Sequence, residues 1–153
     1  MDGDILHRHS REIPAFELAS EDELVDWAQA RGGRLLVVDD SATNRIVTAS
    51  LMRKAGFTVE TAEGGAEAIT AVCDADQPYD AVLMDIAMPE VDGIAATRAI
   101  RGLPGTRSST PIIAVTAHGF AEDRERCLDA GMNAYVVKPV RRSLLLAALH
   151  SWL

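Results

Sequence analysis

Short apolar segments alternate with segments of helical spacing from Leu35 to the C-terminus, and this alternation constrains the fold most. It predicts strands at residues 35–38, 57–62, 79–84, 112–115 and 134–137. It predicts helices at residues 43–55, 65–73, 93–101, 121–130 and 141–153. The strands are apolar throughout, as expected when helices cover both faces of a sheet. The sequence therefore predicts an α/β fold, a doubly wound five-stranded parallel sheet with five helices joined by right-handed crossovers.

The first 34 residues differ from this pattern, since they hold eight acids and four arginines and lack a strand. Ser20 and Glu23 form a capping box that starts a short helix at about residues 20–31, with Leu24, Trp27 and Ala28 on one face. We expect residues 1–34 to be an N-terminal extension or linker, and residues 35–153 to be the main domain. The short helix either docks on that domain or is the end of a linker.

The composition excludes several functional classes. The net charge is −8 and no run is rich in lysine or arginine, which argues against nucleic-acid binding. No stretch approaches the ~18 apolar residues of a membrane span, and the polar N-terminus does not resemble a signal peptide. Cys73 and Cys127 are too few for a disulfide scaffold and indicate reduced thiols. We expect a cytoplasmic protein without membrane contact, as a monomer or weak dimer.

Polar residues with distinct chemistry follow four of the five predicted strands. Asp39 and Asp40 follow the first strand, Asp85 the third, Thr116 the fourth and Lys138 the fifth. In an open parallel sheet, ligands bind beyond the carboxyl ends of the strands. We therefore expect three carboxylates, one hydroxyl and one ammonium group to meet at one edge of the sheet.

These residue types suit a metal-assisted phosphoryl transfer. Three neighbouring carboxylates raise each other's pKa values, and a hard cation such as Mg2+ or Ca2+ relieves their repulsion. Asp85 can act both as a ligand and as a nucleophile that forms an aspartyl phosphate. Lys138 and Thr116 can bind the phosphoryl oxygens, which is the electrostatic positioning that phosphoryl transfer needs.

The ordered set of motifs resembles the receiver domain of bacterial two-component response regulators, a domain of flavodoxin-like type. The resemblance covers Leu35 to Leu153. It rests on four motifs, Val-Val-Asp39-Asp40, Met-Asp85-Ile-Ala-Met-Pro89 with Asp92-Gly93, Ala-Val-Thr116-Ala117 and Val-Val-Lys138-Pro139. Asn44, Arg45 and Cys127 are similar to residues of receivers attached to hybrid histidine kinases, although each taken singly is typical of ordinary helix surface or packing.

The resemblance implies roles for these residues. Asp85 would be the phosphoacceptor, with Thr116 and Lys138 in contact with the phosphoryl group. Asp39 and Asp40 would bind Mg2+ together with Asp85, and the carbonyl of Ala87 would complete the metal shell. The bond between Lys138 and Pro139 resembles one that is cis in the family.

The resemblance also implies a switch. Tyr135 matches a mobile aromatic residue that rotates inward when phosphorylation draws Thr116 toward the phosphoryl group, which changes the partner affinity of the face formed by residues 121–153. A half-buried core tyrosine is the alternative. In the family, the positions of Ala87 and His118 flank the site and tune how readily water attacks the phosphoryl group. Ala87 offers no polar side chain, and His118 either orients water or contacts the phosphoryl oxygens, or is an exposed loop histidine with no such role.

The resulting hypothesis is a signalling phosphoacceptor, and not an enzyme. It takes a phosphoryl group from a histidine kinase or a histidine phosphotransfer protein and passes the signal to a downstream protein. It would be a single-domain regulator or the C-terminal receiver of a hybrid kinase. One alternative is a haloacid-dehalogenase-like, metal-dependent phosphohydrolase, although Ala87 stands where such enzymes usually carry a second acid. Another is an interaction module of receiver shape that is not phosphorylated.

Overall fold

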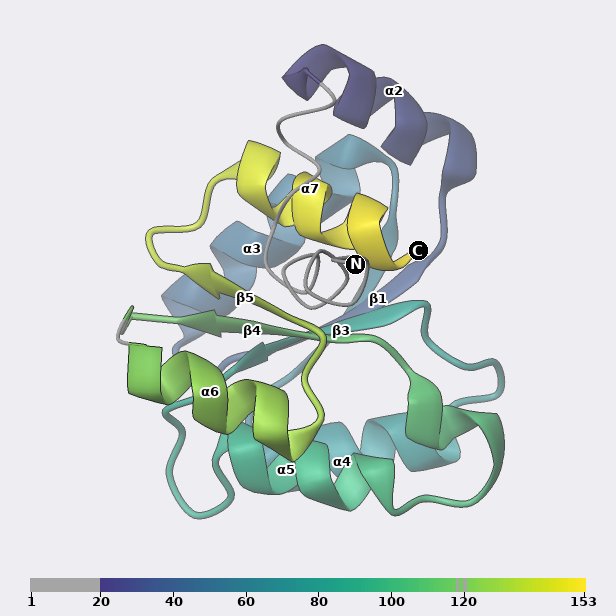
Figure 1. Ribbon diagram of the computed structural model, residues 1–153. Helices are drawn as coiled ribbons and strands as arrows, with labels where there is room; N and C mark the ends of the chain where they lie inside the picture. The colour runs from purple at the N-terminus through teal and green to yellow at the C-terminus, as the bar shows by residue number, and fades with distance from the viewer. Residues whose placement is uncertain (1–19, 118, 120) are drawn as a thin grey trace, which may run out of the picture.

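The fold rests on a parallel sheet with helices on both faces (Figure 1). The computed structural model describes residues 20–117, 119 and 121–153. The strands are β1 (Arg34–Val38), β2 (Thr58–Ala62), β3 (Ala81–Asp85), β4 (Ile112–Thr116) and β5 (Ala134–Val137). They pair in parallel in the order β2-β1-β3-β4-β5, so the order reverses beside β1 and β3. This confirms the predicted doubly wound, five-stranded parallel sheet.

Helices cover the sheet on both sides. The described α-helices are α2 (Glu21–Arg31), α3 (Ala42–Ala55), α4 (Gly65–Asp74), α5 (Gly93–Arg101), α6 (Ala121–Ala130) and α7 (Arg142–Trp152). Helices α3 and α7 lie on one face, whereas α4, α5 and α6 lie on the other (Figure 1). A short 3-10 helix, η2 (Gly105–Ser109), between α5 and β4 was not predicted. Within the described residues, none of the helices has both the length and the apolar character that crossing a membrane requires.

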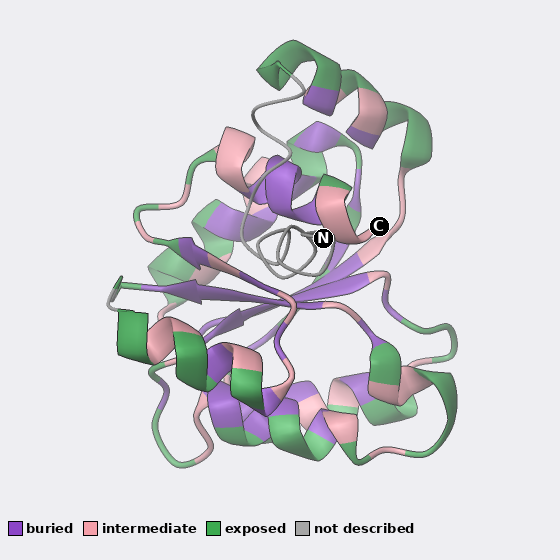
Figure 2. Cartoon of the chain, in the orientation of Figure 1, coloured by how far each residue is buried: buried purple, intermediate pink, exposed green. Residues whose placement is uncertain are grey.

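Alternate residues of each central strand supply two separate cores, because successive side chains of a strand point to opposite faces. Leu35, Val37 and Leu83 pack with α3 and α7 in one core. Leu36 and Met84 pack with α4, α5 and α6 in the other. Figure 2 shows the central strands almost continuously buried. A sheet packed on both faces fixes its strand ends, and therefore any groups that those ends carry.

Helix α2 docks on the domain and forms a further layer outside α3 and α7 (Figure 1). The predicted capping box is present, since Ser20 Oγ accepts from the N–H of Glu23 and the Glu23 carboxylate accepts from the N–H of Ser20. Leu24 and Ala28 are buried, and the ring of Trp27 packs edge-on against His150 with centroids 4.9 Å apart. Helix α2 thus contributes to the hydrophobic core and docks on the domain, instead of being the end of a separate linker.

The end of α3 is shaped to receive α2. Gly56 has a positive φ of 117°, a left-handed conformation that ends α3. A Cβ at Gly56 would lie 3.0 Å from the Cα of Gln29, so a larger residue would push α2 away. After α2, the N–H of Arg34 donates to Asp80 Oδ2 over 2.7 Å and ties the start of β1 to the loop before β3.

Candidate functional site

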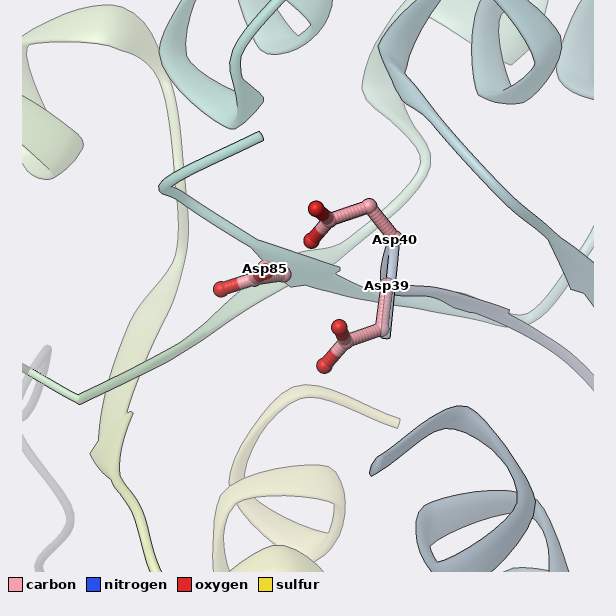
Figure 3. Close-up of side chains that lie close together, drawn as sticks. All are labelled: Asp39, Asp40 and Asp85. Carbon is pink, nitrogen blue, oxygen red and sulfur yellow. The ribbon is translucent and has the colours of Figure 1, made fainter. Parts of the chain in front are cut away.

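The three predicted carboxylates meet at the carboxyl edge of the sheet (Figure 3). Val38 pairs with Met84, and this register places Asp39 beside Asp85 on neighbouring parallel strands. One carboxylate oxygen from each of Asp39, Asp40 and Asp85 lies within 4.8 Å of the others. Asp39 and Asp85 are buried, while Asp40 is exposed. The edge therefore holds a compact all-oxygen group that opens to solvent on the side of Asp40.

Lys138 supplies positive charge to this group. Its Nζ donates to Asp39 Oδ2 over 3.0 Å and to Asp85 Oδ1 over 3.5 Å. Burial lowers the pKa of Lys138, but the hydrogen bond to Asp39 and the charge of Asp85 outweigh that effect and raise its pKa overall. Lys138 is therefore a fixed cation at neutral pH, held between two buried carboxylates.

The single ammonium group of Lys138 does not neutralise the negative charge of the three carboxylates. Burial, followed by repulsion from Asp39, raises the pKa of Asp85 from 3.8 to about 6, although Lys138 acts in the opposite direction. A further positive charge would therefore stabilise the ionised form of Asp85. Carboxylate oxygens in this number are the ligands that a small hard cation such as Mg2+ prefers, usually shared with water and phosphate oxygens. The donor set thus fits a divalent cation.

The loop after β3 is packed tightly against the acids. Asp92 Oδ1 caps α5 by accepting from the N–H of Ala95 over 2.8 Å. The N–H of Gly93 donates to the carbonyl oxygen of Ile86 over 2.8 Å, and a Cβ at position 93 would collide with the carbonyl oxygen of Asp85. The Asp92-Gly93 motif therefore folds the loop back onto the site.

Thr116 lies at the end of β4 and is buried. It borders a cleft of about 350 Å³ whose other lining residues are Ile86, Ala87, Met88, Asp92, Asp123 and Arg126. Ala87 is exposed in this cleft, so a small group has access to the neighbourhood of Asp85 from that side. Ala87 and Thr116 therefore share one cleft with Ile86, the residue that follows Asp85.

Tyr135 lies on the strand beside Thr116. Ala114 pairs with Tyr135 and Thr116 pairs with Val137, so the pleat places Tyr135 and Thr116 on the same face of the sheet. Tyr135 is half-buried against the core beneath α5 and α6, and burial is the main reason that its pKa is raised. This position is compatible both with a switch and with a core tyrosine.

The remaining predicted residues are Pro139 and His118. The peptide bond between Lys138 and Pro139 is cis, as the resemblance implied. Pro139 also lines a second cleft of about 170 Å³, together with Asn44, Val47, Thr48, Lys138 and Val140. His118 lies outside the described residues, so its predicted place beside the site is not tested.

One site residue is absent from the predicted set. Arg45, in the first half of α3, donates from Nη1 to the carbonyl oxygen of Asp39 over 2.9 Å, and its Nη2 lies 4.0 Å from Glu63 Oε1. The sequence does contain a signal, since Arg45 follows Asn44 in the pair that is similar to receivers of hybrid kinases. An arginine taken alone is nevertheless more typical of an ordinary helix surface.

Comparisons with known proteins agree with this geometry. The family model described as "Response regulator receiver domain" matches residues 35–150. The "Sensor protein GacS" of Pseudomonas syringae pv. syringae is 38% identical over 125 residues, which are 80% of this chain and 14% of that protein. The "Two-component response regulator ORR41" of Oryza sativa subsp. japonica is 41% identical over 114 residues, which are 73% of this chain and 87% of that protein.

A solved structure matches as well. The receiver domain of the sensor histidine kinase PA1611 from Pseudomonas aeruginosa PAO1, with a magnesium ion coordinated in its active-site cleft, superposes with a TM-score of 0.72. It is 40% identical, and the match covers 79% of this chain and 97% of that one.

The relatives differ in what surrounds the matching part. This chain spans about one seventh of the Pseudomonas syringae sensor protein, but most of the rice response regulator. The comparisons give no support to a phosphohydrolase of the haloacid-dehalogenase type, and Ala87 lacks the acid that such a site would carry. With its sheet order, its acids at adjacent strand ends and its match over residues 35–150, the chain belongs to the response regulator receiver domain family.

Proposed function

We propose that Asp85 accepts a phosphoryl group from a phosphohistidine. The observation that carries this proposal is the position of its carboxylate, buried beside Asp39 and Asp40 with the ammonium of Lys138 at 3.5 Å. Nucleophilic attack by a carboxylate oxygen forms an aspartyl phosphate, and breaking the phosphorus–nitrogen bond releases the imidazole of the donor. The reaction needs mainly positioning and charge stabilisation, which the site is arranged to supply.

Individual residues have separate tasks in this proposal. Lys138 holds Asp85 in place and then stabilises the charge of the incoming phosphoryl oxygens. Thr116, at the rim of the cleft, donates a hydrogen bond to one of these oxygens. Asp39, Asp40 and Asp85, with the main-chain carbonyl of Ala87, would hold a Mg2+ ion, which supplies the positive charge that the acids and the phosphoryl group share. The charge imbalance around Asp85 supports this metal site.

The output side of the proposal concerns Thr116 and Tyr135. Both lie on one face of the sheet, so a shift of Thr116 toward a phosphoryl group would leave space that Tyr135 can enter. The surface formed by α6, β5 and α7 would then favour a different partner, as a population shift between two packings. A downstream protein that binds residues 121–153 would read this change.

A donor protein would dock beside the acids. Ile46 and Val47 on α3 are 66% and 46% exposed, which is unusual for large apolar residues of this domain. Val47 also lines the small cleft that reaches Lys138 and Pro139. An apolar helix of a histidine kinase or a histidine phosphotransfer protein fits such a surface, and its phosphohistidine would then face Asp85. We infer that the receiver does this in the cytoplasm as a monomer or weak dimer.

We also propose that the folded receiver includes α2, which moves its N-terminal boundary from residue 35 to at least Ser20. The buried side chains of α2 and an ion pair of 3.1 Å between Glu21 and Arg142 support this boundary. On this proposal the domain extends beyond the residues 35–153 expected from the sequence. It would be either a single-domain regulator or one part of a hybrid kinase, because the relatives include both kinds of protein.

Phosphotransfer from a phosphorylated histidine phosphotransfer protein tests the proposal. With Mg2+ present, the wild-type protein should gain acyl-phosphate label, and Asp85→Asn should gain none. Asp74→Asn is the matched control, since Asp74 is an exposed acid at the C-terminal end of α4. Label that persists in Asp85→Asn would refute the proposed acceptor.

A further inference from the structure

The side chain of Arg45 reaches from α3 across the end of β1. Its Nη1 donates to the main-chain carbonyl oxygen of Asp39 over 2.9 Å, and only 16% of the side chain is exposed. At 4.0 Å from Nη2 is Glu63, the residue that follows β2. Arg45 therefore joins three segments, namely α3, the turn that carries two acids, and the end of the neighbouring strand.

The carbonyl group that Arg45 binds lies between two of the three acids. It belongs to the peptide unit that joins Asp39 to Asp40, and a peptide unit is planar. Its orientation is set by the ψ angle of Asp39 and the φ angle of Asp40. A hydrogen bond to this carbonyl therefore fixes the orientation of the peptide that leads into Asp40. That orientation sets the direction from which the Asp40 carboxylate approaches Asp85.

Three other bonds hold Asp39 and the turn that follows it. Oδ1 of Asp39 accepts from the N–H of Ser41 over 2.9 Å, and Oδ2 accepts from Lys138 over 3.0 Å. The N–H of Asp39 continues the strand pairing by donating to the carbonyl oxygen of Ala62 over 3.2 Å. The bond from Ser41 closes a turn across Asp40, and the other two bonds hold the Asp39 side chain and its N–H. Of these four bonds, the one from Arg45 is the one that holds the carbonyl of the peptide leading to Asp40.

We propose that Arg45 is a positioning residue for cation binding, because it orients the Asp39–Asp40 peptide so that both carboxylates converge with Asp85. The inference rests on the Mg2+ site of the proposed function. A guanidinium near three acids also opposes a metal cation by charge. That opposing effect is small here because the guanidinium binds a main-chain carbonyl and faces the carboxylate of Glu63. Positioning therefore dominates, and loss of Arg45 should weaken the site.

A second arginine of α3 provides a matched control. Arg53 donates from Nη2 to the carbonyl oxygen of Val59 over 2.8 Å, so it also braces the backbone beyond its helix, although Arg53 itself is exposed. Arg53 is eight residues from Arg45 and does not contact the turn at residues 39–41 within the described structure. Arg45→Met and Arg53→Met each remove one charge and one bond to a carbonyl, but only Arg45→Met touches the acid pair.

Titration with Mg2+ alone, followed by amide chemical shifts in two-dimensional NMR spectra, measures the affinity without any phosphorylation. Arg45→Met should bind Mg2+ about 10-fold more weakly than wild type, the usual effect of removing a group that orients a metal ligand. Arg53→Met should bind as wild type does. The N–H of Ser41 should exchange faster with solvent in Arg45→Met, because the turn is less ordered.

Arg45→Lys is a second variant, which keeps the charge and one donor and should lie between wild type and Arg45→Met. Unchanged or tighter Mg2+ binding by Arg45→Met would overturn the proposal. Equal weakening by Arg53→Met would also overturn it, since the effect would then be a general loosening of α3. If wild type itself shows no Mg2+ response, the metal site of the proposed function fails, and Arg45 loses its role with it. Mg2+ binding that depends on Arg45 without any phosphotransfer to Asp85 would instead refute the proposed acceptor alone.

Discussion

Replacing Asp85 by asparagine should stabilise the metal-free protein at neutral pH. Burial and the charge of Asp39 raise the pKa of Asp85 from 3.8 to about 6, so the folded state disfavours the ionised carboxylate. Each pKa unit corresponds to 1.36 kcal/mol, so ionisation of this group removes about 3 kcal/mol of stability. The stability that the protonated Asp85 side chain provides is fully present below about pH 3.8 and is lost as the pH rises through about 6. Asparagine has nearly the same shape, keeps an oxygen for Lys138 and carries no charge.

Urea unfolding in EDTA at several pH values measures this effect. We expect Asp85→Asn to be more stable than wild type by up to about 3 kcal/mol at pH 7, and the difference to shrink toward pH 4. Excess Mg2+ should narrow the difference at pH 7, because it stabilises the wild-type acids. Asp74→Asn, an exposed control, should change little at either pH. Equal or lower stability of Asp85→Asn at pH 7 in EDTA would refute the electrostatic reasoning.

Three further outcomes follow from the packing. Leu24→Ala should lower the free energy of unfolding by about 2–3 kcal/mol in urea, because this α2 side chain is buried, whereas a separate linker helix would show no such loss. Arg101→Met should lower the free energy of unfolding by about 2–4 kcal/mol in the same assay, because four hydrogen-bond acceptors lose their donor. These acceptors are the carbonyl oxygens of Gly131, Ser108 and Thr110 and the side chain of Asn133. Native protein should react with a thiol reagent at exposed Cys73 and not at Cys127, whose pKa burial raises to about 11, and equal labelling of both would contradict the structure.

Much of the fold and site could be predicted because parallel strands end together. Once residues 35–38 and 79–84 are assigned as strands, Asp39 and Asp85 must share an edge of the sheet, whatever the details of packing. The strand assignments were correct to within about two residues, and the structure includes Asp85 in β3. The cis bond at Pro139 came from the family resemblance and not from the residues alone.

Features that depend on distant contacts could not be predicted. The capping box at Ser20 predicts where α2 begins, but its docking depends on Gly56 and on His150, which only the folded chain brings near. The 3-10 helix η2 is short and lacks the periodicity that marks a longer helix. The Asn44-Arg45 pair marks Arg45 in the sequence, but not its partner, because Arg45 bonds to the main-chain carbonyl of Asp39 and any residue carries such a carbonyl.

Chemical mapping of the phosphorylated residue tests the central claim most directly. Borohydride reduces an aspartyl phosphate to homoserine, which mass spectrometry of peptides can place within the chain. After phosphotransfer with Mg2+ and reduction, we expect homoserine at position 85, and aspartate retained at Asp39 and Asp40 beside it. Homoserine at Asp39 or Asp40, or a phosphorylated protein without homoserine at position 85, would contradict the assignment of Asp85 as the acceptor.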